Sequence, residues 1–151
     1  MTYQEKIDWL LGYREQKEKI HELDCELKEM QEIMQEQREF FADSQGDWKR
    51  TCQEKEARAV KERELVLAKE QRKLMAMNDA IESAIQRLDD TRQRRVMRMI
   101  YIGGRNQDQV CEKANYCKRN ISRIHSDAVN TLQLRPEELQ AGMGVGKSAG
   151  T

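Results

Sequence analysis

The sequence predicts an all-α protein, and two features of its 151 residues support that prediction. Apolar residues recur at coiled-coil spacing through the first half of the chain, and helix caps and turn residues divide the second half into short helices. The composition agrees, because 38% hydrophobic, 36% charged and 5% aromatic residues are too lean for a large compact core and typical of long exposed helices.

The first predicted helix carries apolar residues in alternating steps of three and four, the pattern of a coiled-coil seam. It is predicted to break over residues 40–47, where Asp47 can cap a second helix and the chain reverses. The seam positions are Ile20, Leu23, Leu27, Met30, Met34 and Phe41, with Gln37 in the remaining core position.

The second predicted helix runs from Trp48 to Leu88, about 60 Å at 1.5 Å per residue. Arg63 and Glu70 occupy core positions of its seam, so residues 48–66 should associate more weakly than residues 67–88. Such a helix needs a partner, which is the first helix folded back, a second subunit, or both; we expect a homodimer built through residues 1–88. Its apolar seam consists of Val60, Leu67, Leu74, Ile81 and Leu88, with Met77 and Ala84 between them.

The following segment is divided by caps and glycines. Asp89-Asp90-Thr91 can cap a helix from Arg92 to Ile102, which Gly103-Gly104 ends. Asn106 with Gln109 resembles a capping box, so a further helix should run from about Gln107 to Ala114. In the helix that precedes the glycines, the predicted buried stripe is Val96, Met99 and Ile100.

A tight turn at Asn115 and a last helix of about residues 117–133 complete the outline of a helix-turn-helix. Asn tolerates the left-handed backbone conformation that such a turn needs. We therefore expect a helical hairpin or coiled coil over 1–88, a helix-turn-helix module over 89–135 and a flexible tail over 136–151. The side chains that should pack between the two crossed helices are Val110, Cys111, Ala114, Ile121 and Ile124.

Charge is distributed unevenly along the chain. Residues 1–47 hold 6 basic and 13 acidic side chains, whereas residues 91–135 hold 10 basic and 3 acidic ones. Lys118 and Arg119 stand where a helix N-terminus already carries partial positive charge, so a sequence tuned only for stability would place acidic residues there. An anionic partner such as nucleic acid would offset that cost.

The predicted helix-turn-helix segment resembles a known family. Three pieces of the chain carry the resemblance: Arg95-Val96-Met97-Arg98-Met99-Ile100-Tyr101-Ile102-Gly103-Gly104, Gln109-Val110-Cys111 and Lys118-Arg119-Asn120-Ile121-Ser122-Arg123-Ile124-His125. Together they are similar to the fourth region of bacterial sigma factors. More narrowly, they are similar to phage late-gene activators of the RinA and ArpU type. Cys111, Asn115 and Cys117 depart from the usual Ala, Gly and Ser or Thr. The resemblance, over residues 80–134, implies DNA binding near promoters, with recognition-helix positions at Lys118, Arg119, Asn120, Ser122 and Arg123.

The leading hypothesis is therefore a phage or prophage transcriptional regulator. Its recognition helix would enter the major groove of double-stranded DNA, and its coiled coil would supply dimerisation or a contact with bacterial RNA polymerase. Two alternatives stay open: a coiled-coil adaptor whose basic end is incidental, and a small terminase subunit, although that class usually carries its DNA-binding module first. The expected phosphate contacts are Arg92, Arg94, Arg95 and Arg105.

Other activities are not expected. The chain shows no signal peptide or membrane span, which predicts a cytoplasmic protein, and it lacks a convergent set of catalytic groups, which argues against an enzyme. Residues 141–148 match a permissive P-loop, but no strand precedes them and almost no helix can follow. We expect no cofactor and no metal, since Cys25, Cys52, Cys111 and Cys117 lack zinc-site spacing and should be reduced thiols.

Overall fold

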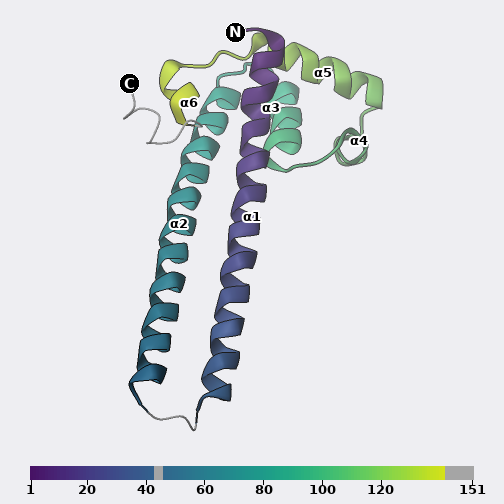
Figure 1. Ribbon diagram of the computed structural model, residues 1–151. Coiled ribbons are helices and arrows are strands. Elements are labelled where there is room, and N and C mark those ends of the chain that lie inside the picture. Colours follow the sequence, from purple (N-terminus) through teal and green to yellow (C-terminus); the bar gives the residue numbers. More distant parts are fainter. Residues whose placement is uncertain (43–45, 142–151) are drawn as a thin grey trace. The chain divides into compact units, whose positions relative to one another are not determined.

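The computed structural model describes residues 1–42 and 46–141 (Figure 1). Every regular element within these ranges is a helix, which confirms the predicted all-α class. The chain forms two compact units, a two-helix unit of Glu18–Arg72 and a composite unit of Met1–Lys17 with Lys73–Thr151. The elements are α1 (Tyr3–Phe40), α2 (Asp47–Gln86), α3 (Thr91–Met97), η1 (Arg98–Ile102), α4 (Gln107–Ala114), α5 (Lys118–Thr131) and α6 (Pro136–Ala141).

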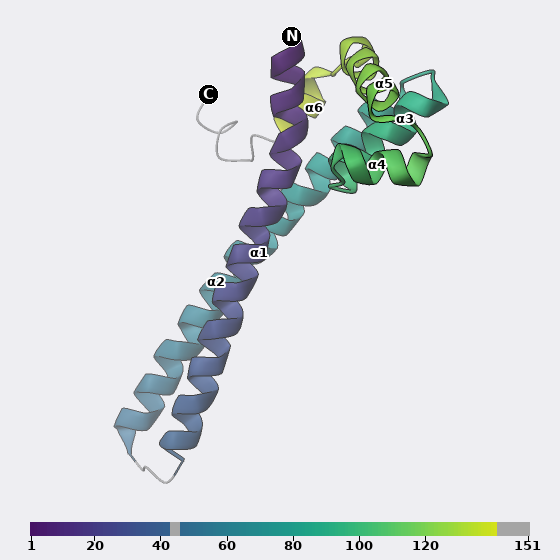
Figure 2. The ribbon, with the colours of Figure 1, turned by 90° about the vertical axis from the view of Figure 1, so that its right-hand side faces the viewer.

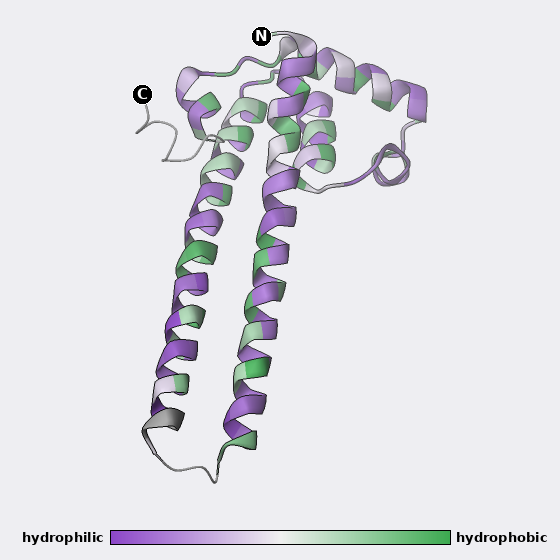
Figure 3. Ribbon diagram, in the orientation of Figure 1, coloured by the Kyte–Doolittle hydropathy of each residue, from purple (hydrophilic) through white to green (hydrophobic). Residues whose placement is uncertain are grey.

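The two-helix unit is held by the predicted seam between α1 and α2. Leu27, Val60 and Leu67 form its buried cluster, and Ile20, Leu23, Met30 and Met34 pack against it. Hydrophilic residues occupy most positions along both helices (Figure 3). The prediction was wrong at the far end of the seam: Gln37 is exposed, and Phe41 lies outside the cluster because α1 has already ended at Phe40.

Ion pairs flank this seam at its polar positions. Arg63 lies 3.3 Å from Glu26, and Lys19 lies 3.3 Å from Glu70. Pairs exposed to solvent contribute only about 0 to 1 kcal/mol each. The cohesion of the two-helix unit therefore depends mainly on its few apolar contacts.

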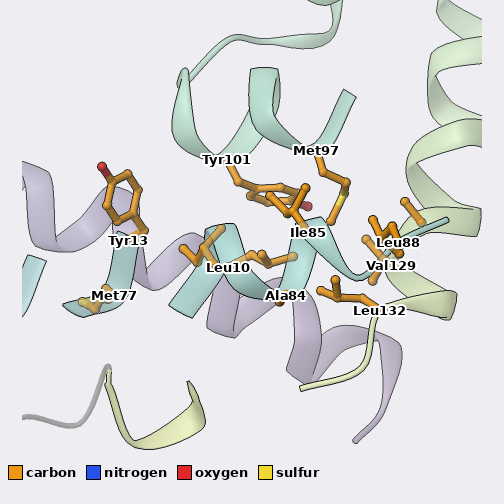
Figure 4. Packing of buried hydrophobic residues seen from close by; sticks show 12 residues of the cluster. Leu10, Tyr13, Met77, Ala84, Ile85, Leu88, Met97, Tyr101, Val129 and Leu132 are labelled. Carbon is orange, nitrogen blue, oxygen red and sulfur yellow. The ribbon is translucent and has the colours of Figure 1, made fainter. Parts of the chain in front are cut away.

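The composite unit has a larger core, in which the start of α1 packs against the end of α2 (Figure 4). Leu10 and Ile85 are fully buried there, and Leu88 is buried just after α2 has ended at Gln86. The seam of α2 is thus covered within one chain by the folded-back first helix, one of the two partners that the sequence left open. The cluster comprises Leu10, Tyr13, Met77, Ile81, Ala84, Ile85, Leu88, Met97, Tyr101, Ala128, Val129 and Leu132.

The segment α3–η1 lies between this core and a second cluster. Met97 and Tyr101 belong to the first cluster, whereas Val96 and Met99 belong to the second. The sequence predicted only the second of these buried sides, and it placed Ile100 fully inside, where the structure leaves it half-buried. The segment α3–η1 therefore contributes side chains to both clusters, and through this packing it joins the ends of the long helices to α4 and α5.

The predicted α-helix from Arg92 to Ile102 was wrong over its last five residues. The α-helix ends at Met97, and residues 98–102 form a π-helix in which the Gly103 N–H donates to the Arg98 carbonyl at 2.8 Å. A Cβ atom on Gly103 would lie 2.8 Å from the Met99 carbonyl oxygen. Glycine is therefore needed where the wide turn closes.

The second cluster confirms the predicted packing of the last two helices of the module. Ile121 and Val110 have no exposed surface, and Cys111 packs at the edge as a small side chain. Figures 1 and 2 show α3, α4 and α5 gathered together. The buried members of this second cluster are Val96, Met99, Val110, Ala114, Ile121 and Ile124.

Residues 136–141, predicted as the start of a flexible tail, form the short helix α6, which an ion pair fastens. The two terminal guanidinium nitrogens of Arg87 donate to Glu138, at 2.8 and 2.5 Å, and the backbone N–H of Arg135 donates to the same carboxylate at 2.7 Å. Burial raises the pKa of Glu138, but these hydrogen bonds and the charges of Arg87 and Arg135 outweigh it, so the pKa lies below its ordinary value. The carboxylate is thus held in its charged form.

Ile121→Ala should lower the free energy of unfolding by about 2 to 5 kcal/mol, because a fully buried side chain is cut back in a close-packed cluster. Urea titration followed by circular dichroism measures this loss. Arg119→Ala, at an exposed position of the same helix, is the control and should change stability by less than about 0.5 kcal/mol. Equal losses from the two variants would contradict the assignment of the buried face.

Glu138→Gln should destabilise the protein at pH 7 by about 1 to 3 kcal/mol, since it removes a charge-assisted pair from a carboxylate that is 7% exposed. A carboxyl whose folded pKa is lowered stabilises the fold above its unfolded pKa of about 4.3, and this contribution disappears as the pH falls through the folded pKa. The difference between wild type and variant should therefore shrink below pH 4.3. A difference in urea midpoint that is independent of pH would contradict this account.

Candidate nucleic-acid interface

The helices α4 and α5 meet at the turn that the sequence predicts. The Asn106 side chain accepts from the Gln109 N–H, and the Gln109 side chain accepts from the Asn106 N–H, so the capping box is confirmed. The helix ends at Asn115, whose φ of 60° and ψ of 39° are left-handed. The next helix begins at Lys118, so the connection is only three residues long and fixes the angle between the helices.

One side of α5 is buried and the other is cationic. Ile121, Ile124 and Ala128 face the interior. The residues predicted to contact DNA lie on the remaining surface, where Lys118, Arg119 and Arg123 are exposed, and Asn120 and Ser122 are half-buried. We call these five residues the cationic face of α5. It occupies the N-terminal half of the helix and points away from the core.

The electrostatics at the start of α5 are unusual for a helix. Its first turn contains no acidic residue, and Cys117 in the cap position makes no side-chain capping bond. The nearest acidic partner is Asp108, whose carboxylate lies 3.6 Å from Lys118 across an exposed gap. Cys117 itself is exposed. The helix dipole and the lysine and arginine therefore all present positive charge to solvent.

The remaining predicted arginines are located elsewhere. Arg94, Arg95 and Arg105 line an open groove of about 580 Å³ together with Arg98, which the sequence analysis had not singled out. Arg92 is absent from the lining and pairs with Asp90, 3.5 Å away. We call this surface the arginine groove. Its other lining residues are Gln86, Thr91, Met99, Ile102 and Gly103.

Intramolecular hydrogen bonds hold three of the four guanidinium groups, and the longest of them joins Arg95 to the Lys113 carbonyl at 3.4 Å. Arg94 donates to the Leu88 carbonyl and, at 3.1 Å, to the Thr91 hydroxyl. Arg98 donates to Glu82 at 3.2 Å and to Gln86 at 2.7 Å, joining η1 to the end of α2. The spacing of residues 91, 94, 95, 98 and 102 along one helical side could have revealed Arg98 from the sequence.

A hydrogen bond joins η1 to α5. The Tyr101 hydroxyl lies 2.5 Å from His125 Nε2, and Tyr101 is buried. Burial raises the pKa of Tyr101 and lowers the pKa of His125, so both groups are neutral at pH 7. The hydroxyl can then donate to Nε2 when the ring proton is on Nδ1. His125 is therefore a packing residue of α5, and the sequence analysis did not assign it this role.

The described residues form no metal site, and the P-loop-like motif falls outside them. Among the described residues, no group of three or more His, Cys, Asp or Glu side chains could hold a metal ion. His21 and Cys25 lie 3.7 Å apart as an isolated pair, and all four cysteines are free. Beyond Ala141, the P-loop-like segment lies outside the described residues. In the described part of the chain, no helix is both long and apolar enough to cross a membrane.

Comparison with known proteins places the chain in a family. Residues 52–133 match the family model described as "Protein of unknown function (DUF1492)", and the chain belongs to this family. The match includes most of α2 and the whole segment from α3 through α5. No curated protein and no solved structure matches the chain.

Tyr101→Phe should lower the free energy of unfolding by about 0.5 to 1.5 kcal/mol, because His125 then loses its hydrogen-bond partner in a half-buried position. Thermal unfolding measures the change. Tyr116→Phe, at the edge of the second cluster, removes a hydroxyl from a half-buried tyrosine and serves as the matched control. If the two variants unfolded alike, the Tyr101 hydrogen bond would contribute no stability.

Proposed function

We propose that this member of the DUF1492 family binds double-stranded DNA sequence-specifically and regulates transcription of phage or prophage genes. The observation that carries the proposal is the cationic face of α5, presented at the start of a helix that follows a three-residue turn. A helix of this kind fits the major groove of B-DNA with its N-terminal residues toward the base edges.

The charge and chemistry of the face support DNA as the partner. Lys118 and Arg119 concentrate positive charge at the N-terminus of a helix, where the dipole already attracts phosphate. Asn120 and Arg123 carry side chains that form paired hydrogen bonds with adenine and guanine edges, respectively. Carboxylates of an acidic protein surface would also pair with the guanidinium group of Arg123, so selectivity for a DNA sequence is the property that separates the two kinds of partner.

The family supports the biological setting. It is associated with phages in general, and the resemblance of residues 95–125 to late-gene activators points to promoter-proximal DNA. A small terminase subunit would also bind phage DNA, but the order of modules in this chain, with α4 and α5 after the long helices, favours the regulator.

The two-helix unit suits a contact with protein. It exposes large apolar side chains at Ile33, Phe40, Leu65 and Val66. We propose that this unit supplies homodimerisation or a contact with bacterial RNA polymerase. In the competing adaptor hypothesis, this contact is the whole function and the cationic face of α5 is incidental.

Arg123→Ala should reduce discrimination between a selected DNA site and a scrambled duplex by about 1 to 3 kcal/mol, through loss of a bidentate base contact. The site is first obtained by repeated selection from a random duplex library, and affinities are then measured by fluorescence anisotropy. Arg58→Ala, which removes an exposed cation from α2, is the matched control and should leave discrimination unchanged.

Two results would count against the proposal. Failure of the wild-type protein to enrich any sequence would leave the adaptor hypothesis in place. Equal losses for the selected and scrambled duplexes on Arg123→Ala would show that Arg123 contacts phosphate and does not discriminate bases.

A further inference from the structure

The arginine groove is a concentrated positive surface. Its nine lining residues include four arginines and no acidic side chain. Glu82 lies just outside the lining and pairs with Arg98 alone. The groove therefore keeps the positive charge of Arg94, Arg95 and Arg105, because no acidic side chain in its lining neutralises them.

The guanidinium groups are held in place and still have donors to offer. The bonds from Arg94 to Leu88 and Thr91, and from Arg98 to Glu82 and Gln86, fix both head groups. Each guanidinium has five N–H donors, so these bonds leave several for a ligand. Ordering of the donors before binding lowers the entropic cost of binding an anion.

The groove and the cationic face of α5 use different side chains. The groove is lined by residues from the end of α2, from α3 and η1 and from the segment just after η1, and by none from α5. The cationic face belongs to α5 alone. The two surfaces can therefore be altered separately by substitution.

We propose that the arginine groove is a second phosphate-binding site, which takes adjacent phosphate groups of a polyphosphate chain or of a nucleic-acid strand other than the one contacted by α5. A phosphate group offers several oxygen acceptors to guanidinium forks that approach from different sides. Ile102 and the edge of Met99 also line the groove beside the arginines. The volume of about 580 Å³ lies within the usual range of ligand sites.

The test compares two double variants by isothermal titration calorimetry with sodium tripolyphosphate and with ATP. Arg95→Ser with Arg105→Ser removes two cations from the groove but keeps Arg94 and Arg98, which tie the corner between α2 and α3. Arg119→Ser with Arg123→Ser removes the same charge from α5. The groove variant should bind tripolyphosphate roughly tenfold more weakly or worse, and the α5 variant should bind as the wild type does.

The second arm distinguishes the sources of phosphate. Tighter binding of ATP than of tripolyphosphate would identify a free nucleotide, whereas a tenfold loss of duplex or single-stranded DNA affinity in the groove variant would identify a nucleic-acid strand. The proposal is overturned if wild type binds neither probe at millimolar concentration and the groove variant keeps its DNA affinity, or if both double variants lose tripolyphosphate binding equally. Sequence discrimination by the α5 variant tests the proposed function separately, because tripolyphosphate carries no sequence.

Discussion

The burial of two sides of α3–η1 is the constraint on which the rest of the composite unit depends. Met97 and Tyr101 are buried with the ends of the long helices, while Val96 and Met99 are buried with α4 and α5. Val96 and Met97 already belong to different clusters within the regular helix α3, and Met99 and Tyr101 continue the two buried sides through the π-turn. Gly103 permits this turn, because any Cβ atom there would meet the Met99 carbonyl.

This packing allows α5 to carry positive charge in its first turn, where helices normally have acidic residues. Ile121, Ile124, Ala128 and Val129 anchor the helix on one side. Core burial contributes several kcal/mol, whereas unfavourable charge at a helix N-terminus costs about 0.3 to 1 kcal/mol per residue. The helix therefore remains stable although Lys118 and Arg119 oppose its dipole, and their charge stays available for an anionic partner.

Local signals in the sequence predicted much of this structure. Asn106 and Asn115 set the bounds of α4, and heptad spacing located the seam at Leu27, Val60 and Leu67. The core around Leu10 was missed because buried Gln16 interrupts the apolar spacing of α1 before Ile20. The π-turn was not predicted. Of the four arginines in the groove only Arg98 was missed, although its spacing from Arg94 and Arg95 places it on the same helical side.

The hydrogen bond between Tyr101 and His125 gives a physical reason for two sequence features to occur together. Tyr101-Ile102-Gly103 and the segment ending in His125 are separate pieces of the resemblance, yet the Tyr101 hydroxyl and the His125 ring lie 2.5 Å apart. The phenol and the imidazole satisfy each other, and either one alone would lose its partner at a cost of about 0.5 to 1.5 kcal/mol. The pair fixes the rotation of α5 about its own axis relative to η1, and this rotation decides which side chains the helix presents to solvent.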